Sequence, residues 1–382
     1  MTNKKFTILF AHLAYLPPCI GKTGTLELAR VLAWRGHRVH VVCCRQPDQP
    51  AEETLDGIQI HRLPFSDQES VWLSGRFAFA LIKKIRRLNA AEPIDIIHVF
   101  NPFLFAGFTL FGLRLLVGSA RRVFDIRTGS LRPGLRQKVA EVSFRIARRQ
   151  ADVTVSLDER LGQKLFPGKT TPTIPLGVNP ELFKTDIVKR TELRRQQAIS
   201  DDTTVFIYSG TLDRKRRLGI LVAGFIKALL KLPKSKLILL GDGNDRPELE
   251  RLAGRLAGNE ILFTGRVPYH EVSSWLNIAD AAVSYVPKMA IYEHQPPLKV
   301  PEYLAAELPV LATNTAGNET YVRNGYNGLI VPDSINGIEV GFLELSEKLA
   351  GLKKNTRSSI ERFTWPQIVE HDLLPVYENL RR

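Results

Sequence analysis

The stretch "TVFIYSGTLDRKRRLGILVAGFIKALLKLPKSKLILLGDG" (Thr204–Gly243) decides the fold prediction. Apolar, β-rich runs at its two ends, Thr204–Gly210 and Lys236–Gly243, enclose a segment with helical spacing. The alternation continues with the strand-like runs Glu260–Gly265 and Ala281–Val286. Strands that alternate with helices indicate parallel βαβ units with right-handed crossovers. The stretch therefore predicts a doubly wound parallel sheet.

The first half of the chain has the same alternation. A strand-like run, Phe6–His12, precedes a helical pattern that ends at Gly36, and "HRVHVVCC" (His37–Cys44) follows as a strand. Later expected strands are Gly57–Leu63, Asp95–Phe100, Arg122–Arg127, Asp152–Ser156 and Thr171–Leu176. The polar stretch Lys184–Asp202 has the composition of a connector. We therefore expect two Rossmann-like domains, residues 1–183 and 184–364, that face a ligand cleft formed at the carboxyl ends of their strands.

Composition indicates a soluble globular protein and an uneven charge. The 382 residues are 44% hydrophobic and 24% charged, values that exclude a disordered or fibrous chain. Of the net charge of +14, residues 1–180 carry +12, with 26 Lys and Arg against 14 Asp and Glu. The remaining residues carry 27 against 25, a net +2. This asymmetry predicts an anionic partner for the first half.

Cysteine content and apolar runs bear on the cellular compartment. The three cysteines are too few for a disulfide framework, and two of them, Cys43 and Cys44, lie in an apolar strand, as expected in a reducing cytoplasm. The N-terminal apolar run is too short for a signal peptide. The run Phe103–Gly118 contains Arg114 and is shorter than the roughly 20 residues of a membrane span. We expect it to form a buried or interfacial helix.

The segment "GKTGT" (Gly21–Thr25) contains Gly-Lys-Thr, as a P-loop does. A P-loop also requires a glycine five residues before Gly21, where Leu16 stands, so the motif is absent. What remains is a glycine-bearing loop that opens a helix. Its backbone N–H groups either meet an anion or simply form a βα turn, and the sequence leaves both interpretations open.

Several segments of the second half together resemble the C-terminal half of the family 4 retaining glycosyltransferases, which have the GT-B fold. They are "YSGTLDRKRRLGILVAGF", "LLGDGNDRPEL", "ILFTGRVPYHEV" and the long run from Lys299 to Pro332. The resemblance extends to "IPLGVNPELF" (Ile174–Phe183) and to the C-terminal "FTWPQIVEHDLLPVYENL". It implies that a C-terminal helix, residues 365–382, packs back on the first domain. With its "PLK..EY" sequence at Pro297–Tyr303, the chain resembles a variant branch of this family.

The resemblance implies that residues around Glu302 bind a nucleotide-sugar donor. Glu302 matches the second glutamate of a Glu-seven-residues-Glu motif, which binds ribose hydroxyls. The first glutamate would fall at His294, beside Glu293, and in the family it contacts the donor sugar. Leu298 is placed in the same site, and Lys299 either faces the diphosphate or caps the surface.

The basic cluster after Gly210 is matched to the phosphates of the donor. Arg216 corresponds to the family's phosphate clamp, whereas Thr211 stands where the family has a partner arginine. Fixed cations stabilise a leaving diphosphate without a metal, so no metal and no separate cofactor are expected. Arg214, Lys215 and Arg217 either share the task or form a solvated face.

The remaining donor-site residues follow from the same matches. Gly210, Gly241 and Gly243 would let the backbone approach the nucleotide, Arg266 and Val267 would line the base, and Gly317 and Glu319 in "AGNE" would lie near the ribose and phosphates. In the first half, "DIIHVF" matches a "D..H.H" strand end in which His98 is kept. Phe100 replaces the second histidine, so no general acid–base role falls there. We interpret His98 as a satisfied core histidine.

These matches predict an enzyme that transfers a sugar, with retention, from a UDP- or GDP-linked donor to a lipid-linked or polysaccharide acceptor. The alternatives are a binding or assembly protein without transfer activity and a nucleotide-sugar epimerase. Basic and aromatic residues interleave in Val71–Leu88 and Phe144–Gln150, which is typical of a membrane-surface face and also of a solvated helix face. We expect a cytoplasmic protein attached to the inner face of an anionic membrane. No nucleic-acid motif is present, so nucleic acid is not an expected partner.

Overall fold

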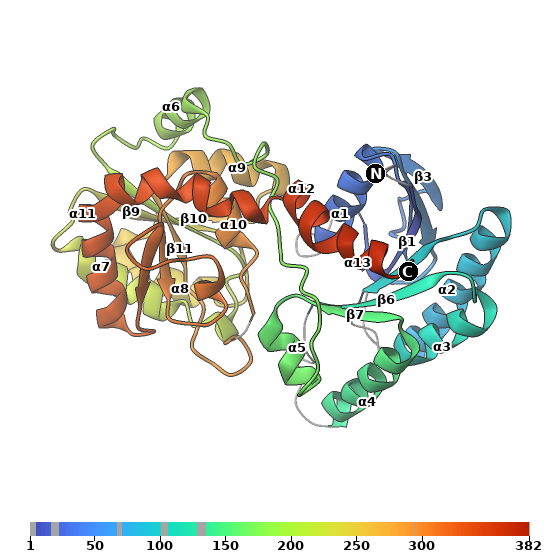
Figure 1. The fold of residues 1–382 in the computed structure, drawn as a ribbon. Helices are drawn as coiled ribbons and strands as arrows, with labels where there is room; N and C mark the ends of the chain where they lie inside the picture. Colours follow the sequence, from blue (N-terminus) through green and yellow to red (C-terminus); the bar gives the residue numbers. More distant parts are fainter. Residues whose placement is uncertain are drawn as a thin grey trace. The chain divides into compact units, whose positions relative to one another are not determined.

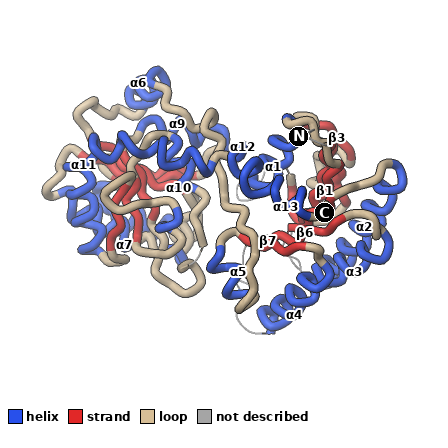
Figure 2. Tube along the Cα trace, in the orientation of Figure 1, coloured by secondary structure: helices blue, strands red, loops and turns tan. Residues whose placement is uncertain are grey.

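The computed structural model describes residues 5–16, 23–66, 71–100, 106–127, 135–293 and 295–381. The chain divides into two compact units (Figures 1 and 2). Unit 1 comprises Met1–Leu176 together with Trp365–Arg382, and unit 2 comprises Gly177–Thr364. Each unit is an α/β domain with a doubly wound sheet, as the sequence predicts.

Unit 1 contains a seven-stranded sheet in the order β3-β4-β2-β1-β5-β6-β7. The pairs are parallel except for the β3–β4 hairpin. Phe10 of the central strand is paired with Val41 on one side and with His98 on the other. The strands are β1 (Thr7–Tyr15), β2 (Arg38–Cys44), β3 (Glu52–Leu55), β4 (Ile58–Leu63), β5 (Ile96–Phe100), β6 (Arg121–Ile126) and β7 (Val153–Ser156).

The two faces of this sheet carry different helices. Because strand side chains alternate, Ile8 and Phe10 join one core cluster and Leu9 and Ala11 join the other. The first cluster holds α1 and the C-terminal segment, and the second holds α2, α3 and α4. The helices are α1 (Thr23–Trp34), α2 (Val71–Ala91), α3 (Ala106–Leu116), α4 (Leu135–Gln150) and α5 (Glu159–Leu165).

The C-terminal segment is part of the core of unit 1. It is helical throughout, as α12 (Trp365–Ile368), a π-helical turn η5 (Val369–Leu373) and α13 (Leu374–Asn379). The Trp365 ring packs on α1, where a Cβ at Gly24 would lie 3.2 Å from it. Tyr377 is fully buried, and its hydroxyl lies 2.7 Å from Nδ1 of His98. Both imidazole nitrogens of His98 are paired, since Nε2 lies 3.0 Å from Oδ2 of Asp125.

Unit 2 contains a six-stranded, fully parallel sheet in the order β10-β9-β8-β11-β12-β13. Phe206 and Tyr208 of the central strand face a core shared with α7 and α11. On the other face, the Tyr303 hydroxyl of α10 accepts the N–H of Ser209 at 2.8 Å. The strands are β8 (Thr204–Ser209), β9 (Ser235–Leu240), β10 (Ile261–Gly265), β11 (Ala281–Ser284), β12 (Val310–Thr313) and β13 (Gly328–Val331).

Two helices of unit 2, α6 and α11, begin after a residue whose side chain caps the first turn. The long α11 has an N-cap, Ser334, whose side chain accepts the N–H of Gly337. The α-helices are α6 (Ile187–Gln196), α7 (Gly219–Leu229), α8 (Arg246–Ala253), α9 (Tyr269–Ile278), α10 (Lys299–Ala305) and α11 (Ile335–Ile360). Short 3-10 turns are η1 (Arg214–Arg216), η2 (Gly254–Leu256), η3 (Asn318–Thr320) and η4 (Glu361–Phe363).

Three predictions made from the sequence require correction. The run Thr171–Leu176 is not a strand, because only Thr173 forms an isolated bridge, to Ser156. The hairpin strand β3 was not expected, since its charged sequence EETL lacks a strand pattern. Residues 177–183 belong to unit 2 rather than to the first domain, because Val178 pairs with Thr364 and the Phe183 ring packs on that of Tyr269.

Among the described residues, no helix is long and apolar enough to cross a membrane.

The buried contact between Tyr377 and His98 yields a test of the fold. Tyr377→Phe keeps the ring but leaves Nδ1 of His98 without its partner. We expect the free energy of unfolding to fall by about 1–3 kcal/mol, the range for an unsatisfied buried polar group. Denaturant unfolding monitored by circular dichroism measures the change. An unchanged midpoint would show that the hydroxyl does not anchor the C-terminal segment.

Candidate functional site

The candidate site in unit 2 lies where the strand order reverses. In the order β10-β9-β8-β11-β12-β13, successive βα units run one way from β8 and then the other way from β11. Ligands in such sheets bind outside the carboxyl ends of the strands at this switch point. The sequence-predicted residues that follow β8, β9 and β11 gather at this edge: Gly210, Thr211, Arg216, Gly241, Gly243, Glu293, Leu298, Lys299 and Glu302.

Glycines allow the loops at this edge to pack closely. Gly241 has φ +147°, and a Cβ there would lie 1.9 Å from the carbonyl oxygen of Gly210. A Cβ at Gly243 would lie 2.5 Å from the carbonyl carbon of Leu212. Gly241 also forms an isolated bridge with Gly265, which joins the loop after β10. The glycines therefore hold three consecutive loops together, a packing role that is separate from their predicted approach to a nucleotide.

Tyr208 forms the floor of the site, and Lys299 lies over it. The Lys299 ammonium is 3.6 Å from the centre of the Tyr208 ring, within cation–π distance. Desolvation lowers the pKa of Lys299 well below its usual value, Arg216 lowers it further, and Glu302 opposes the change. Lys299 thus lies in a partly desolvated cationic cluster.

Arg216 is held by a second aromatic ring. Its guanidinium carbon lies 4.8 Å from the centre of the Tyr292 ring. Arg216 is half-buried, whereas the neighbouring cations Arg214, Lys215 and Arg217 are exposed. Of the four basic residues in the cluster, Arg216 is therefore the one that the structure fixes beside Lys299.

Glu302 is a half-buried carboxyl group on the first turn of α10. The Tyr269 hydroxyl donates to its Oε1 at 2.8 Å. Desolvation raises the pKa of Glu302 to about 7, although Tyr269 and Lys299 both act in the opposite direction. A carboxylate with these neighbours has unused acceptor capacity for hydroxyl groups.

Glu293 ties two loops of the site together. Its Oε1 accepts the N–H of Ala316 at 3.3 Å, and its carbonyl oxygen accepts the N–H of Gly317 at 2.9 Å. A Cβ at Gly317 would lie 2.2 Å from the carbonyl oxygen of Gln295, so glycine is required for this approach. Asn318 anchors the same loop, because its fully buried amide donates to the carbonyl oxygens of Ser284 and Thr313.

The other predicted residues vary in their placement. Thr211, Arg266 and Glu319 are exposed, Leu298 is 38% exposed, and Val267 is half-buried. Gly21 and His294 lie outside the described residues. Sequence reasoning missed Tyr208, Tyr269 and Tyr292, whose only signal was an aromatic residue next to a matched motif.

In unit 1, His98 belongs to a buried polar network rather than to an open site. Asp125 pairs with His98 and also accepts from Arg127, whose Nη2 lies 2.6 Å from Oδ2. Burial lowers the pKa of His98, and Arg127 contributes most to the lowered pKa of Asp125, against desolvation. Phe100 stacks on His98 with ring centres 4.7 Å apart. The interpretation of His98 as a satisfied core histidine is confirmed.

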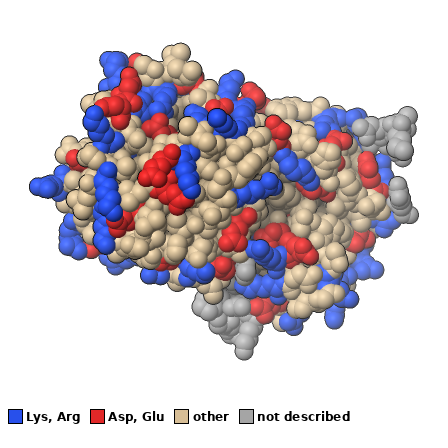
Figure 3. All heavy atoms as spheres, turned by 60° about the vertical axis from the view of Figure 1, so that its left-hand side comes forward, with Lys and Arg blue, Asp and Glu red and all other residues tan. Residues whose placement is uncertain are grey.

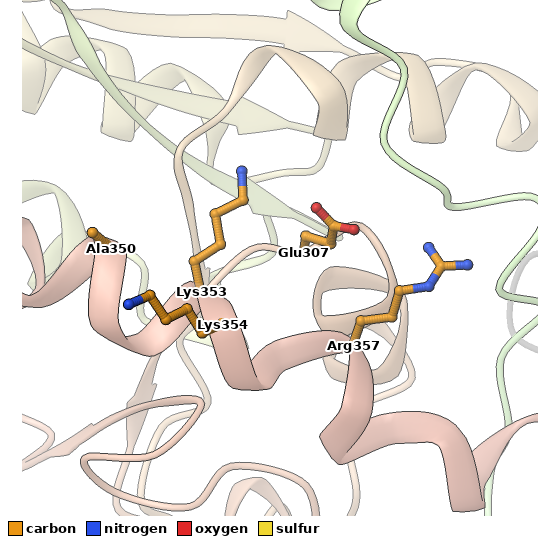
Figure 4. A pocket seen from close by; sticks show the side chains of 5 residues that line it. All are labelled: Glu307, Ala350, Lys353, Lys354 and Arg357. Carbon is orange, nitrogen blue, oxygen red and sulfur yellow. The ribbon is translucent and has the colours of Figure 1, made fainter.

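A surface hollow in unit 2 is not part of the candidate site. It is lined by Glu307, Ala350, Lys353, Lys354 and Arg357 (Figure 4). Glu307 follows the C-terminal end of α10 and precedes β12, so the hollow lies at the amino edge of the sheet. Lys299 and Glu302 lie at the opposite end of α10.

Two family models match the chain, one in each half. Residues 21–182 match the model described as Glycosyltransferase Family 4, and residues 189–357 match the model described as Glycosyl transferases group 1. The alpha-monoglucosyldiacylglycerol synthase of Acholeplasma laidlawii is 23% identical over 92% of this chain and 91% of its own length. The putative glycosyltransferase EpsD of Bacillus subtilis is 22% identical over 78% and 76%.

Solved structures show the same fold. The sucrose-phosphate synthase of Thermosynechococcus elongatus has a TM-score of 0.77 at 20% identity, with 98% of each chain covered. Anabaena HepE in complex with UDP-glucose has a TM-score of 0.69 at 18% identity, over 98% of this chain and 99% of its own. Each half of the chain therefore matches a glycosyltransferase family model, the two models together span most of the sequence, and the chain has the GT-B fold.

Proposed function

We propose that this protein transfers a sugar, with retention of anomeric configuration, from a nucleotide-sugar donor to a hydroxyl of a lipid-linked or polysaccharide acceptor. The observation that carries the donor assignment is the carboxyl group of Glu302. It lies at the carboxyl edge of the unit 2 sheet, accepts from Tyr269, and has a neighbouring cation in Lys299, which in turn lies near Arg216. Carboxylate and cations together complement a ribose joined to a diphosphate.

Each group has a role that its surroundings support. Ionised Glu302 accepts hydrogen bonds from the ribose hydroxyls, while Lys299 and Arg216 face the diphosphate. The bound diphosphate raises the pKa of Lys299, because an opposite charge favours the ammonium form. Fixed cations also stabilise the charge that develops on the leaving oxygen, so the proposed reaction requires no metal.

The reaction exchanges one bond for another at the sugar. A bond forms between the anomeric carbon and the acceptor oxygen, the bond from that carbon to the diphosphate oxygen breaks, and the acceptor proton passes to the leaving phosphate. This route requires no protein base at the position of Phe100, which stacks on the buried His98.

UDP- and GDP-sugars are the proposed donors. A structural neighbour binds UDP-glucose, and a relative from Mycobacterium tuberculosis is named as a GDP-mannose-dependent mannosyltransferase. In the sequence, His294 falls at the position of the family's sugar-contacting glutamate and Glu293 is its neighbour, so we assign sugar selection to these two residues. A thermal-shift panel of UDP, GDP, ADP and their sugars identifies the donor, because a ligand of the folded state raises Tm.

The proposed acceptor is bound by unit 1 at an anionic membrane surface, on the cytoplasmic side. Residues 1–180 carry the net charge of +12, and the Acholeplasma relative is named as a synthase of a glycolipid. Lys and Arg near anionic lipid contribute about 1 kcal/mol each. The donor-binding half is nearly neutral, so the excess charge is assigned to the acceptor side.

Two alternatives rest on the departures from the family pattern at Thr211, His294 and Phe100. A binding or assembly protein would hold the nucleotide sugar without consuming it, and an epimerase would change the sugar without an acceptor. Mass spectrometry of reactions with and without a glycolipid acceptor separates these three outcomes.

Glu302→Gln is predicted to stabilise the free protein and to weaken donor binding. The folded-state pKa of about 7 lies above the ordinary carboxyl value, so ionising Glu302 costs stability as pH rises toward 7. Glutamine does not ionise, so the variant should gain about 1–2 kcal/mol over wild type at pH 8 and nothing at pH 4. Thermal unfolding at the two pH values measures the gain, and calorimetry measures donor affinity.

Glu307→Gln, at the other end of α10, is the matched control and should change neither property. Unchanged donor affinity in Glu302→Gln would contradict the assignment of Glu302 to the ribose.

Tyr269→Phe is predicted to move the pH dependence of donor binding. Affinity should rise with pH as Glu302 ionises near pH 7. The Tyr269 hydroxyl lowers the pKa of Glu302, so its removal should raise that pKa and shift the binding midpoint to higher pH. The Phe183 ring contact is preserved. Calorimetric titrations from pH 6 to 9 test this, and an unmoved midpoint would show that the hydrogen bond does not control the carboxylate.

A further inference from the structure

An exposed apolar ridge runs along α3 in unit 1. Phe108, Phe111 and Leu115 are 54%, 47% and 67% exposed. Their spacing of three and four residues places them on one face of the helix. The opposite face, which includes Leu110 and Leu113, is fully buried in the core. The helix is therefore apolar on both sides, and its outer side has no cover within the described residues.

Close packing fixes the position of this ridge. A Cβ at Gly107 would lie 2.7 Å from Ile146 of α4, and a Cβ at Gly112 would lie 2.7 Å from Ile82 of α2. The two glycines thus allow α3 to sit tightly between α2 and α4. Figure 1 shows these three helices next to one another. The ridge therefore lies on a helix that packs closely against both of its neighbours.

Cationic side chains lie on both flanks of the ridge. The exposed face of α2 carries Arg76, Lys83 and Arg87, and that of α4 carries Arg145 and Arg149. Each flank also exposes apolar side chains, with Phe79 on α2 68% exposed and Val142 and Ile146 on α4 52% and 44% exposed. The sequences of α2, α3 and α4 contain a single acidic residue, Glu141. On the face drawn in Figure 3, by contrast, Asp and Glu are interspersed with Lys and Arg.

We propose that this surface docks on an anionic lipid bilayer, with Phe108, Phe111 and Leu115 inserted at the boundary between headgroups and acyl chains. The inference deepens the proposed membrane attachment, on which it rests, by naming the surface and the mode of contact. An apolar centre with cationic flanks matches an interface whose headgroups are anionic and whose interior is apolar. A second copy of the chain fits less well, because pairing two such faces would bring like charges together.

The two parts of the surface respond differently to salt. Attraction of Lys and Arg to anionic headgroups is screened within about 10 Å at 0.1 M salt. Insertion of apolar side chains is not screened, and each inserted side chain is worth about tenfold in binding. The proposal therefore predicts a salt-sensitive component and a salt-resistant one.

Vesicle co-sedimentation of the full chain separates the two components. The ridge variant is Phe108→Ser with Phe111→Ser and Leu115→Ser, and the flank variant is Arg145→Gln with Arg149→Gln. The matched control replaces exposed apolar residues of unit 2, Ile187→Ser with Val188→Ser and Leu230→Ser, which are 74%, 79% and 86% exposed. The probes are phosphatidylcholine vesicles with and without phosphatidylglycerol, at low and high salt.

The ridge variant should lose about a thousandfold in binding to anionic vesicles, about tenfold for each of its three side chains, and all of its salt-resistant binding. The flank variant should lose mainly the salt-sensitive part, and the control should bind as wild type does. In the Phe111→Trp variant, lipids brominated on their acyl chains should quench the fluorescence of the introduced tryptophan, because the bromine atoms reach only an inserted side chain.

Equal binding of ridge variant and control, or no quenching, would overturn the proposal. A change in sedimentation coefficient of the ridge variant without vesicles, together with unchanged lipid binding, would instead assign the ridge to a protein interface. Donor binding is measured without vesicles, so a failure of the nucleotide-sugar assignment is distinguishable from a failure of the docking surface. Because the ridge lies in unit 1 and the donor site in unit 2, an unchanged circular dichroism spectrum and unfolding midpoint, rather than donor binding, show that the ridge variant is folded.

Discussion

The carboxyl ends of parallel strands all lie at the same edge of a sheet, and the candidate site depends on this constraint. In unit 2, residues of β8 and of α10, almost a hundred positions apart in sequence, meet at this edge. They do so because β8 ends there and α10 begins there. Tyr208 ends up beneath Lys299, and Ser209 donates to Tyr303 one residue beyond Glu302. Glycines at 210, 241 and 317 then allow the loops to close around these groups without side-chain collisions. The site is thus a consequence of topology and of a few positions without a Cβ.

The electrostatics of the site depend on two half-buried ionisable groups, Glu302 and Lys299. A carboxyl group with a raised pKa and an amine with a lowered pKa lie near each other, and each is disfavoured in its charged form by desolvation. Such opposed shifts are a property of functional sites, where charge is held ready for a ligand at the expense of stability. A ribose and a diphosphate would relieve both groups together. The hydrogen bond from Tyr269 limits the shift of Glu302 and keeps the carboxylate accessible near neutral pH.

Most strands of the two sheets, and the positions of Glu302 and Lys299, could be predicted from the sequence. The strands of both sheets are short apolar runs between helical patterns, and their parallel order follows from the crossovers. The strand predicted at Thr171–Leu176 is absent because its prolines lack the N–H donors that a β-ladder needs. Strand β3 was not predicted because its sequence, EETL, begins with two glutamates and has no apolar pattern. Glu302 and Lys299 followed from their motif. The pairing of Glu302 with Tyr269 spans 33 residues and could be recognised only in three dimensions.

The central claim is that a nucleotide diphosphate binds at the carboxyl edge of the unit 2 sheet. The most direct measurement is a crystal structure of the protein soaked with UDP or with the nucleotide selected by thermal shift. We predict density for the ribose within hydrogen-bond distance of Glu302 and for the phosphates beside Lys299 and Arg216. Density for an ordered nucleotide at any other place, with this edge of the sheet empty, would contradict the account.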